Sequence, residues 1–168
     1  MEVLVAGRGR RQVAQESVDE LTDALLTASR LLVALSARSI AHVDDTLTIA
    51  QFRTLVILST RGPSKIAALA ERLNVQPSTA TRMVDRLVAA GLIDRRLNPD
   101  SRRELIIELT PRGHEIVAAV TDRRREEIAA LVARMPDEDR SGMVRALTAF
   151  SAAGGEPHPA PDIDGYQL

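Results

Sequence analysis

The chain has 168 residues, of which 45% are hydrophobic and 27% are charged, so it can bury the core of one ordinary domain, or of a small domain with a helical addition. Aromatic residues make up only 2% of the chain, which predicts an aliphatic core and argues against a stacking platform for single-stranded nucleic acid. The absence of cysteine excludes disulfides, zinc–thiolate sites and cysteine-based redox chemistry. We recognise neither a secretory signal nor an apolar run of membrane-spanning length, so we expect a soluble, cytoplasmic protein that does not bind membranes.

Both ends of the chain are expected to be flexible. Residues 1–14 show no helical period and contain several glycines and arginines, which indicates an arm. Residues 153–168 are rich in Gly and Pro, which indicates a disordered tail. After the arm, apolar residues recur at helical spacing from Gln15 to about Val43, and this period predicts one long helix.

Two shorter helices are expected next. Thr48 and Gln51 have the spacing of a capping box, which predicts the start of a helix that stops at Gly62. Ser64 is expected to cap the following helix, which ends at Leu73.

The pattern then leads through a turn into a further helix and a hairpin. Pro77 suits the first position of a helix, and the apolar stripe continues to Ala90, where Gly91 is expected to end the helix in the left-handed conformation. The period changes to two, which predicts strands over 92–97 and 104–109. The Pro and Asp between the strands indicate a turn with arginines at its far side.

A second long helix is predicted from Thr110 to about Arg134. Its apolar positions fall into two halves, separated by the charged run 121–127. We therefore expect the first half to pack on the middle of the chain and the second half to enter a separate core. Apolar residues over 143–150 predict a final helix.

The helix that begins at Pro77 has the features of a DNA recognition helix. In a helix-turn-helix, the second helix enters the major groove with its N-terminal residues at the base edges. The outer face here carries amide, hydroxyl and guanidinium groups that can bind bases or phosphates: Gln76, Ser78, Thr81, Arg82, Asp85 and Arg86. Any amphipathic helix has a polar face, but a hairpin with a basic tip follows this one directly. Basic residues also outnumber acidic ones between Arg61 and His114, whereas the rest of the chain is acidic, which indicates that the middle meets a polyanion.

Several segments together resemble the MarR family of transcription regulators in order and spacing. The matching segments are 66–73, 78–87, 91–93, 100–102 and 109–113, and the resemblance covers roughly residues 17–151. The most specific piece is the pair Asp100 and Arg102, followed at short range by Leu109-Thr110 and Gly113.

The resemblance implies a mainly α fold with a small β-wing. A winged helix-turn-helix domain would span 46–114, and a helical dimerisation region would combine 15–45 with 115–152. The implied function is a homodimeric regulator of transcription, most often a repressor, that binds a pseudo-palindromic duplex DNA operator. The implied DNA contacts are Ser78, Thr79, Thr81 and Arg82 in the major groove, Arg102 in the minor groove with Asp100 orienting it, and Arg103 near the backbone.

Many members of this family are released from DNA by a small phenolic or apolar effector. The resemblance leaves such control open here, and the candidate contacts are only His42, Phe52 and Arg53. A lone histidine such as His42 is more typical of a helix surface than of a ligand site. The missing cysteines exclude the members that sense oxidants through cysteine.

Other classes of function have less support in the sequence. The three histidines are far apart, and no catalytic triad, phosphate-binding loop or metal-binding motif is recognisable, so we expect no enzyme, no cofactor and no metal site. The main alternative is a winged helix that serves as a protein-interaction module without specific DNA binding. Binding that falls steeply with salt would distinguish a DNA-binding protein from such a module.

Overall fold

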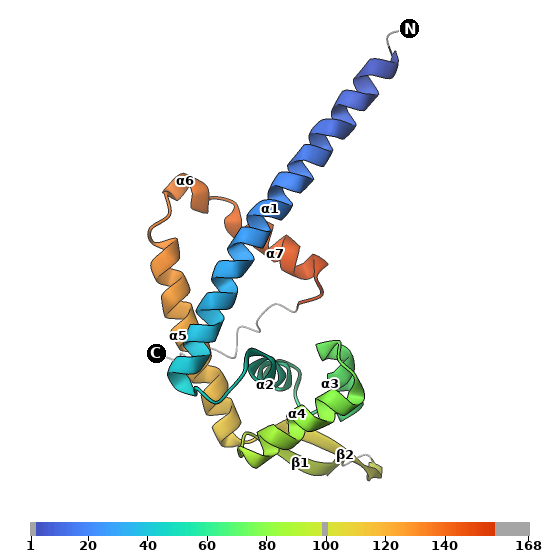
Figure 1. Ribbon diagram of the computed structural model, residues 1–168, viewed down its shortest axis with the longest axis vertical. Helices are drawn as coiled ribbons and strands as arrows, with labels where there is room; N and C mark the ends of the chain where they lie inside the picture. Colours follow the sequence, from blue (N-terminus) through green and yellow to red (C-terminus); the bar gives the residue numbers. More distant parts are fainter. Residues whose placement is uncertain (1–2, 99–100, 157–168) are drawn as a thin grey trace.

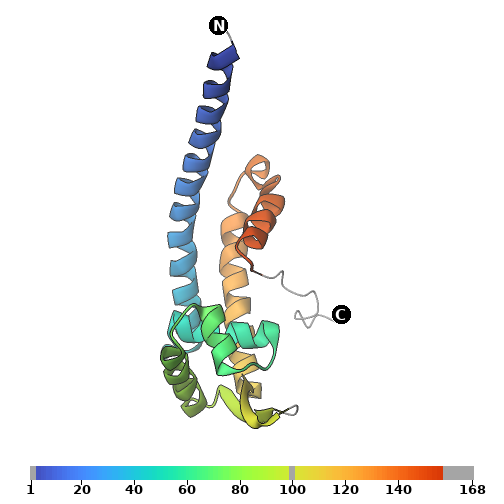
Figure 2. The same ribbon diagram turned by 90° about the vertical axis from the view of Figure 1, so that its right-hand side faces the viewer.

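Two long helices lie side by side above a smaller group of helices and a β-hairpin in the computed structural model (Figures 1 and 2). The structure describes the backbone of residues 3–98 and 101–156 and the side chains of residues 18–98, 101 and 104–156. The elements in chain order are α1 (Val3–Val43), α2 (Ile49–Arg61), α3 (Ile66–Leu73), α4 (Pro77–Ala89), β1 (Ile93–Asn98), β2 (Ser101–Leu109), α5 (Pro111–Val132), α6 (Asp137–Arg140) and α7 (Met143–Ala153). This mainly helical fold with one antiparallel hairpin confirms the predicted fold class.

The helix α1 is longer than the sequence predicted. It ends at Val43 as expected, but it begins at Val3, inside the segment predicted as a flexible arm. Once a helix is nucleated, each added residue gains a hydrogen bond. Ala, Arg and Gln in this segment favour that growth, although Gly7 and Gly9 each cost about 1 kcal/mol relative to Ala.

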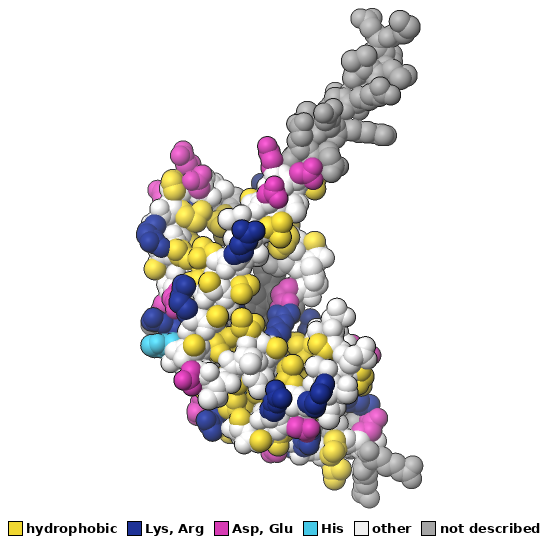
Figure 3. All heavy atoms as spheres, in the orientation of Figure 1, with side chains coloured by type: hydrophobic (Ala, Val, Ile, Leu, Met, Phe, Trp, Pro, Cys, Tyr) yellow, Lys and Arg dark blue, Asp and Glu magenta, His cyan; other side chains and the backbone are white. Residues whose placement is uncertain are grey.

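The segment Val18–Val43 of α1 is long and apolar enough to cross a membrane by length and composition, which corrects the expectation that no such segment exists. An 18-residue window of this segment has a mean hydropathy of 1.4, and 17% of that window is buried. A helix that packs against other helices passes the same test. The lower part of α1 does pack on α5 and α2, and its buried residues are Leu35, Ser39 and Ile40. Figure 3 shows further apolar side chains exposed over α1, α5 and α6.

The core is aliphatic, as the composition predicted, and joins the hairpin to the lower end of α1, to α2, α3 and α4, and to the first half of α5. Phe52 contributes its only aromatic ring among the described residues. The core residues include Leu55, Leu58, Leu69, Val84, Leu87, Leu92, Ile93, Ile107, Val117 and Val120. Because the buried part of α5 stops at Val120, the second half of this helix contributes no buried residue to the core.

The sequence predicted the N-terminal cap of α2 correctly but not that of α3. At α2 the capping box is confirmed, because the Gln51 backbone N–H donates to Thr48 Oγ1 at 3.2 Å and the Thr48 N–H donates to Gln51 Oε1 at 2.9 Å. At α3 the prediction that Ser64 is the cap was wrong. The cap position is Lys65, and the Ser64 backbone pairs instead with Ile107 in β2, with N–O distances of 3.0 and 2.9 Å. Ser64 thereby adds a one-residue bridge beside the hairpin.

The hairpin begins its second strand earlier than predicted. Ile93 lies opposite Leu109 and Leu97 opposite Leu105, as the predicted alternation requires. A register shift after Leu97 then pairs Asn98 with Ser101, so β2 starts at Ser101 rather than at residue 104.

The start of α5 is fitted tightly against the end of α4. Thr110 caps α5 by accepting the Gly113 N–H at 3.0 Å, and its hydroxyl donates to the Gly91 carbonyl at 2.7 Å. A Cβ on Gly113 would stand 2.2 Å from the carbonyl oxygen of Leu92. Glycine is therefore required here by close approach of two backbones rather than by a left-handed conformation.

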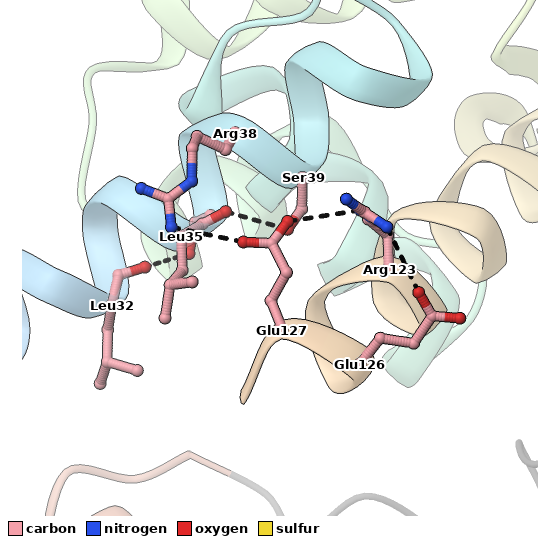
Figure 4. A network of polar contacts seen from close by, with 8 residues as sticks. Leu32, Leu35, Arg38, Ser39, Arg123, Glu126 and Glu127 are labelled. Carbon is pink, nitrogen blue, oxygen red and sulfur yellow. Dashed lines mark hydrogen bonds and ion pairs between the residues drawn. The ribbon is translucent and has the colours of Figure 1, made fainter. Parts of the chain in front are cut away.

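The charged run in α5 joins this helix to α1 (Figure 4). Arg38 Nη2 in α1 donates to Glu127 Oε2 at 3.4 Å, and Arg123 Nε lies 3.4 Å from Glu127 Oε1. The run thus separates the two apolar halves of α5 with a carboxylate shared by two arginines.

Candidate nucleic-acid interface

The orientation of α4 is fixed from its inner face and from both ends. Its buried residues are Ala80, Val84 and Leu87, all fully enclosed in the core. Pro77 occupies the first turn as predicted. At the other end Gly91 has φ +71°, and the Leu92 N–H donates to the Leu87 carbonyl at 3.0 Å, which is the predicted left-handed termination. The opposite face of α4 is consequently presented outward as a unit.

The turn between α3 and α4 is fixed in the same way. Asn74 is left-handed with φ 52°, and it is the one non-glycine residue of the described chain with positive φ. Its N–H donates to the Glu71 carbonyl at 3.0 Å, and the Val75 N–H donates to the Ala70 carbonyl at 3.0 Å. Asparagine tolerates this conformation better than most residues, so the turn holds α3 and α4 at a set angle.

The residues predicted to contact DNA from this helix lie together on its outer face. Gln76, Ser78, Thr81, Arg82 and Arg86 are exposed, and Thr79 is half-buried. The Thr81 hydroxyl donates to the Pro77 carbonyl at 2.9 Å. Its proton is used within the helix, so Thr81 offers an outside partner chiefly its acceptor lone pair.

The two arginines of α4 are unpaired within the described chain. Neither the Arg82 side chain nor the Arg86 side chain has a hydrogen bond or an ion pair to another described residue. They border a shallow hollow of about 330 Å³ between α4 and the start of α2, together with Gln51 and Thr79. Their guanidinium groups are thus available to an external anion or to a guanine edge.

The acidic residue on the same face is neutralised. Asp85 forms an ion pair with Arg95 of β1, so its charge is compensated within the protein. This contact also fixes the hairpin to α4. Figure 3 shows basic side chains over this lower part of the molecule.

The tip of the predicted wing lies partly outside the described residues. Asp100 is not among the described residues. Arg102 and Arg103 belong to strand β2, but the structure describes only their backbone and not their side chains. An ion pair of 2.6 Å joins Arg96 of β1 to Glu108 of β2 across the hairpin, and another of 2.7 Å joins Glu104 of β2 to Lys65 at the start of α3. The hydrogen bond from Lys65 holds the pKa of the Glu104 carboxyl below its usual value.

The structure does not bring the three effector candidates together. His42 is exposed at the end of α1, whereas Phe52 is only 6% exposed and belongs to the core. Arg53 is bound by Glu156, with Nη–Oε distances of 3.0 and 2.7 Å. The sequence missed Glu156, because it lies in a Gly- and Pro-rich stretch that predicted a disordered tail. Among the described residues, no three His, Asp or Glu side chains are grouped so as to hold a metal ion.

Comparison with known proteins places these features in a family. A family profile described as "MarR family" matches residues 47–105. The crystal structure of RV1404 from Mycobacterium tuberculosis is 62% identical to this chain with a TM-score of 0.80, and the match covers 86% of this chain and 98% of that one. The HTH-type transcriptional repressor MdtR of Bacillus subtilis is 29% identical over 126 residues, which is 74% of this chain and 81% of MdtR. A mutant of MepR from S. aureus, bound to an oligodeoxyribonucleotide, shares the fold with a TM-score of 0.59 at 21% identity, covering 79% of this chain and 96% of that one.

Proposed function

The chain belongs to the MarR family of transcription regulators, and on this premise we propose that it is a cytoplasmic, homodimeric repressor that binds a pseudo-palindromic operator in duplex DNA. The observation that carries the proposal is the outer face of α4, where Arg82 and Arg86 are exposed and unpaired within the described chain while Asp85 is neutralised by Arg95. The family consists of regulators rather than enzymes.

The chemistry of α4 suits the major groove. Arg82 can bind the O6 and N7 of guanine with two hydrogen bonds, and Gln76 can pair with adenine in a similar way. Ser78 and Thr79 lie in the first turn, where the helix N-terminus also favours phosphate. Within this proposal Arg86 and Arg103 contact the backbone, and Arg102 enters the minor groove with Asp100 orienting it.

A second copy of the chain would cover the apolar surface that one chain leaves open. Helical spacing puts Leu21, Leu25, Leu32, Leu35 and Ser39 on one face of α1. The lower end of this face is buried, but Leu21 is 60% exposed and Leu32 is 43% exposed. An apolar face of this kind on a soluble protein indicates an interaction site.

The last helix supports the same proposal. No residue of α7 is buried, although Val144, Leu147 and Phe150 are large and apolar. We propose that α1 and α7 of two copies pack together, with residues 15–45 and 115–152 as the dimerisation region and 46–114 as the DNA-binding domain. The exposed stripe of α1 is then a protein interface rather than a membrane span.

Selection from random duplexes tests the proposed function. We expect the enriched sequence to be a pseudo-palindrome whose half-sites lie about one helical turn, ~34–36 Å, apart. Affinity should fall with salt, with a log–log slope of about −0.9 per phosphate contacted. Weak binding without sequence preference would instead identify a protein-interaction module, and a single enriched half-site would contradict the dimer.

A charge on the exposed stripe of α1 tests the dimer. The double variant Leu21→Asp, Leu32→Asp should sediment as a monomer, because two carboxylates would be buried without partners in the interface. Its operator affinity should fall by about a hundredfold or more, since only one half-site can be held. The double variant Thr27→Asp, Ala34→Asp is the control, because helical spacing places both positions on the opposite side of α1. A dimer that survives the first pair of changes would exclude this face from the interface.

A further inference from the structure

A pocket is formed beside the segment that follows α7. Its volume is about 230 Å³, and it opens between α2, α3 and the segment Gly154–Glu156. The α2 and α3 residues that line it are Arg53, Val56, Ile57, Thr60, Arg61 and Arg72. Three of these six residues are arginines.

The positive charge in this pocket exceeds the negative charge. Glu156 supplies one carboxylate, which Arg53 holds with two hydrogen bonds of 3.0 and 2.7 Å. Those bonds lower the pKa of the Glu156 carboxyl, and the charge of Arg61 lowers it further. Neither Arg61 nor Arg72 forms an ion pair with a described residue. Three arginines therefore line the pocket together with a single carboxylate residue.

We propose that this pocket binds a small polyvalent oxyanion, and that Glu156 is an internal occupant which this ligand displaces. The contact between Arg53 and Glu156 demonstrates that a carboxylate fits the site with paired hydrogen bonds. A single carboxylate leaves two guanidinium groups uncompensated, so a ligand with two or three anionic groups matches the charge better. The pocket is smaller than a typical drug-sized site, which limits the ligand to a compact polycarboxylate or phosphate compound.

The position of the pocket connects it to regulation. This step rests on the proposed function, in which α2 and α3 belong to the DNA-binding domain and α7 to the dimer. The Arg53–Glu156 contact joins the two regions directly. A ligand that replaces Glu156 releases the segment after α7 from α2, and operator affinity shifts by as much as the ligand prefers one arrangement over the other.

Titration of the full chain without DNA tests the site itself. Citrate and pyrophosphate serve as the two probes, with acetate at equal ionic strength as the monovalent control. We expect the backbone amide signals of Gly154 and Gly155 to shift with citrate or pyrophosphate but not with acetate. The probe that binds more tightly identifies the source of the anion as a carboxylate or a phosphate.

Three variants test whether Arg53 and Glu156 form the anion site. Glu156→Gln removes the negative charge of the internal occupant and should bind the polyvalent probe roughly tenfold more tightly, whereas Arg53→Gln should bind it at least about tenfold more weakly. Arg134→Gln lies outside the pocket and should leave the affinity unchanged, and circular dichroism would verify that all three variants are folded. The proposal is overturned if neither probe binds the wild type or Glu156→Gln, if acetate binds equally well, or if Glu156→Gln and Arg53→Gln leave the affinity as it was.

A failure of the pocket assignment can be distinguished from a failure of the proposed DNA-binding function. If the probes bind as expected but no operator can be selected, the anion site stands and the DNA-binding proposal fails. If an operator is selected but the probes do not bind, the pocket assignment fails alone.

Discussion

Gly113→Ala is expected to destabilise the protein by on the order of 3–5 kcal/mol, because the added Cβ would overlap a backbone atom that cannot move away. The Cβ would lie 2.2 Å from the Leu92 carbonyl oxygen and 3.2 Å from a methyl group of Leu109. Leu92 is buried, and its carbonyl accepts the Thr110 N–H at 3.1 Å. Moving this carbonyl would therefore break the bond that places the start of α5 against the end of α4.

Urea unfolding followed by circular dichroism measures the effect. Gly154→Ala is the matched control, because Gly154 has φ −81° and its nearest atom to an added Cβ is 3.5 Å away. That variant should stay within about 0.5 kcal/mol of the wild type. A Gly113→Ala protein as stable as the wild type would mean that α5 can shift on its own, and that the Thr110–Gly113 segment does not set the placement of α5 against the end of α4.

Local signals predicted the DNA-binding part of the fold well. Thr48 and Gln51 form the capping box that their spacing indicated, and Pro77 and Gly91 bracket α4. Such features depend on residues within a few positions of each other, so they can be read without knowledge of the tertiary structure. The exposed face of α4 follows from the same helical period, which is why its candidate residues could be named in advance.

Several features that the sequence missed depend on distant partners, unlike the early start of α1 at Val3, which follows from local helix growth. Ser64 has the side chain of a helix cap, yet its backbone pairs with Ile107, forty-odd positions away. Glu156 lies in a stretch of tail-like composition, but it reaches Arg53. In the sequence, Asp85 is one more polar residue on the outer face of its helix. The structure shows that it forms an ion pair with Arg95, which neutralises its charge. Composition and periodicity contain no information on such pairings.

Arg82→Ala is expected to weaken binding to the selected operator by about 1–3 kcal/mol and to relax the preference at one base position of each half-site. Arg82 is exposed and unpaired within the described chain, so removing it leaves no buried group without a partner and should not alter the fold. Its place near the start of α4 is where a helix-turn-helix protein meets the base edges.

Binding to the operator and to a random duplex, measured side by side, separates base recognition from phosphate contact. A residue that recognises a base loses affinity mainly on the operator, whereas a phosphate contact loses affinity equally on both duplexes and lowers the salt slope by about 1. Arg134→Ala removes the same charge beyond the end of α5, away from α4 (Figure 1), and should change neither affinity nor the salt slope once sedimentation shows that the variant is still a dimer. Equal losses for Arg82→Ala on both duplexes would reassign it to the backbone, and base recognition would then have to come from Gln76, Ser78 and Thr79, whose side chains are shorter and uncharged.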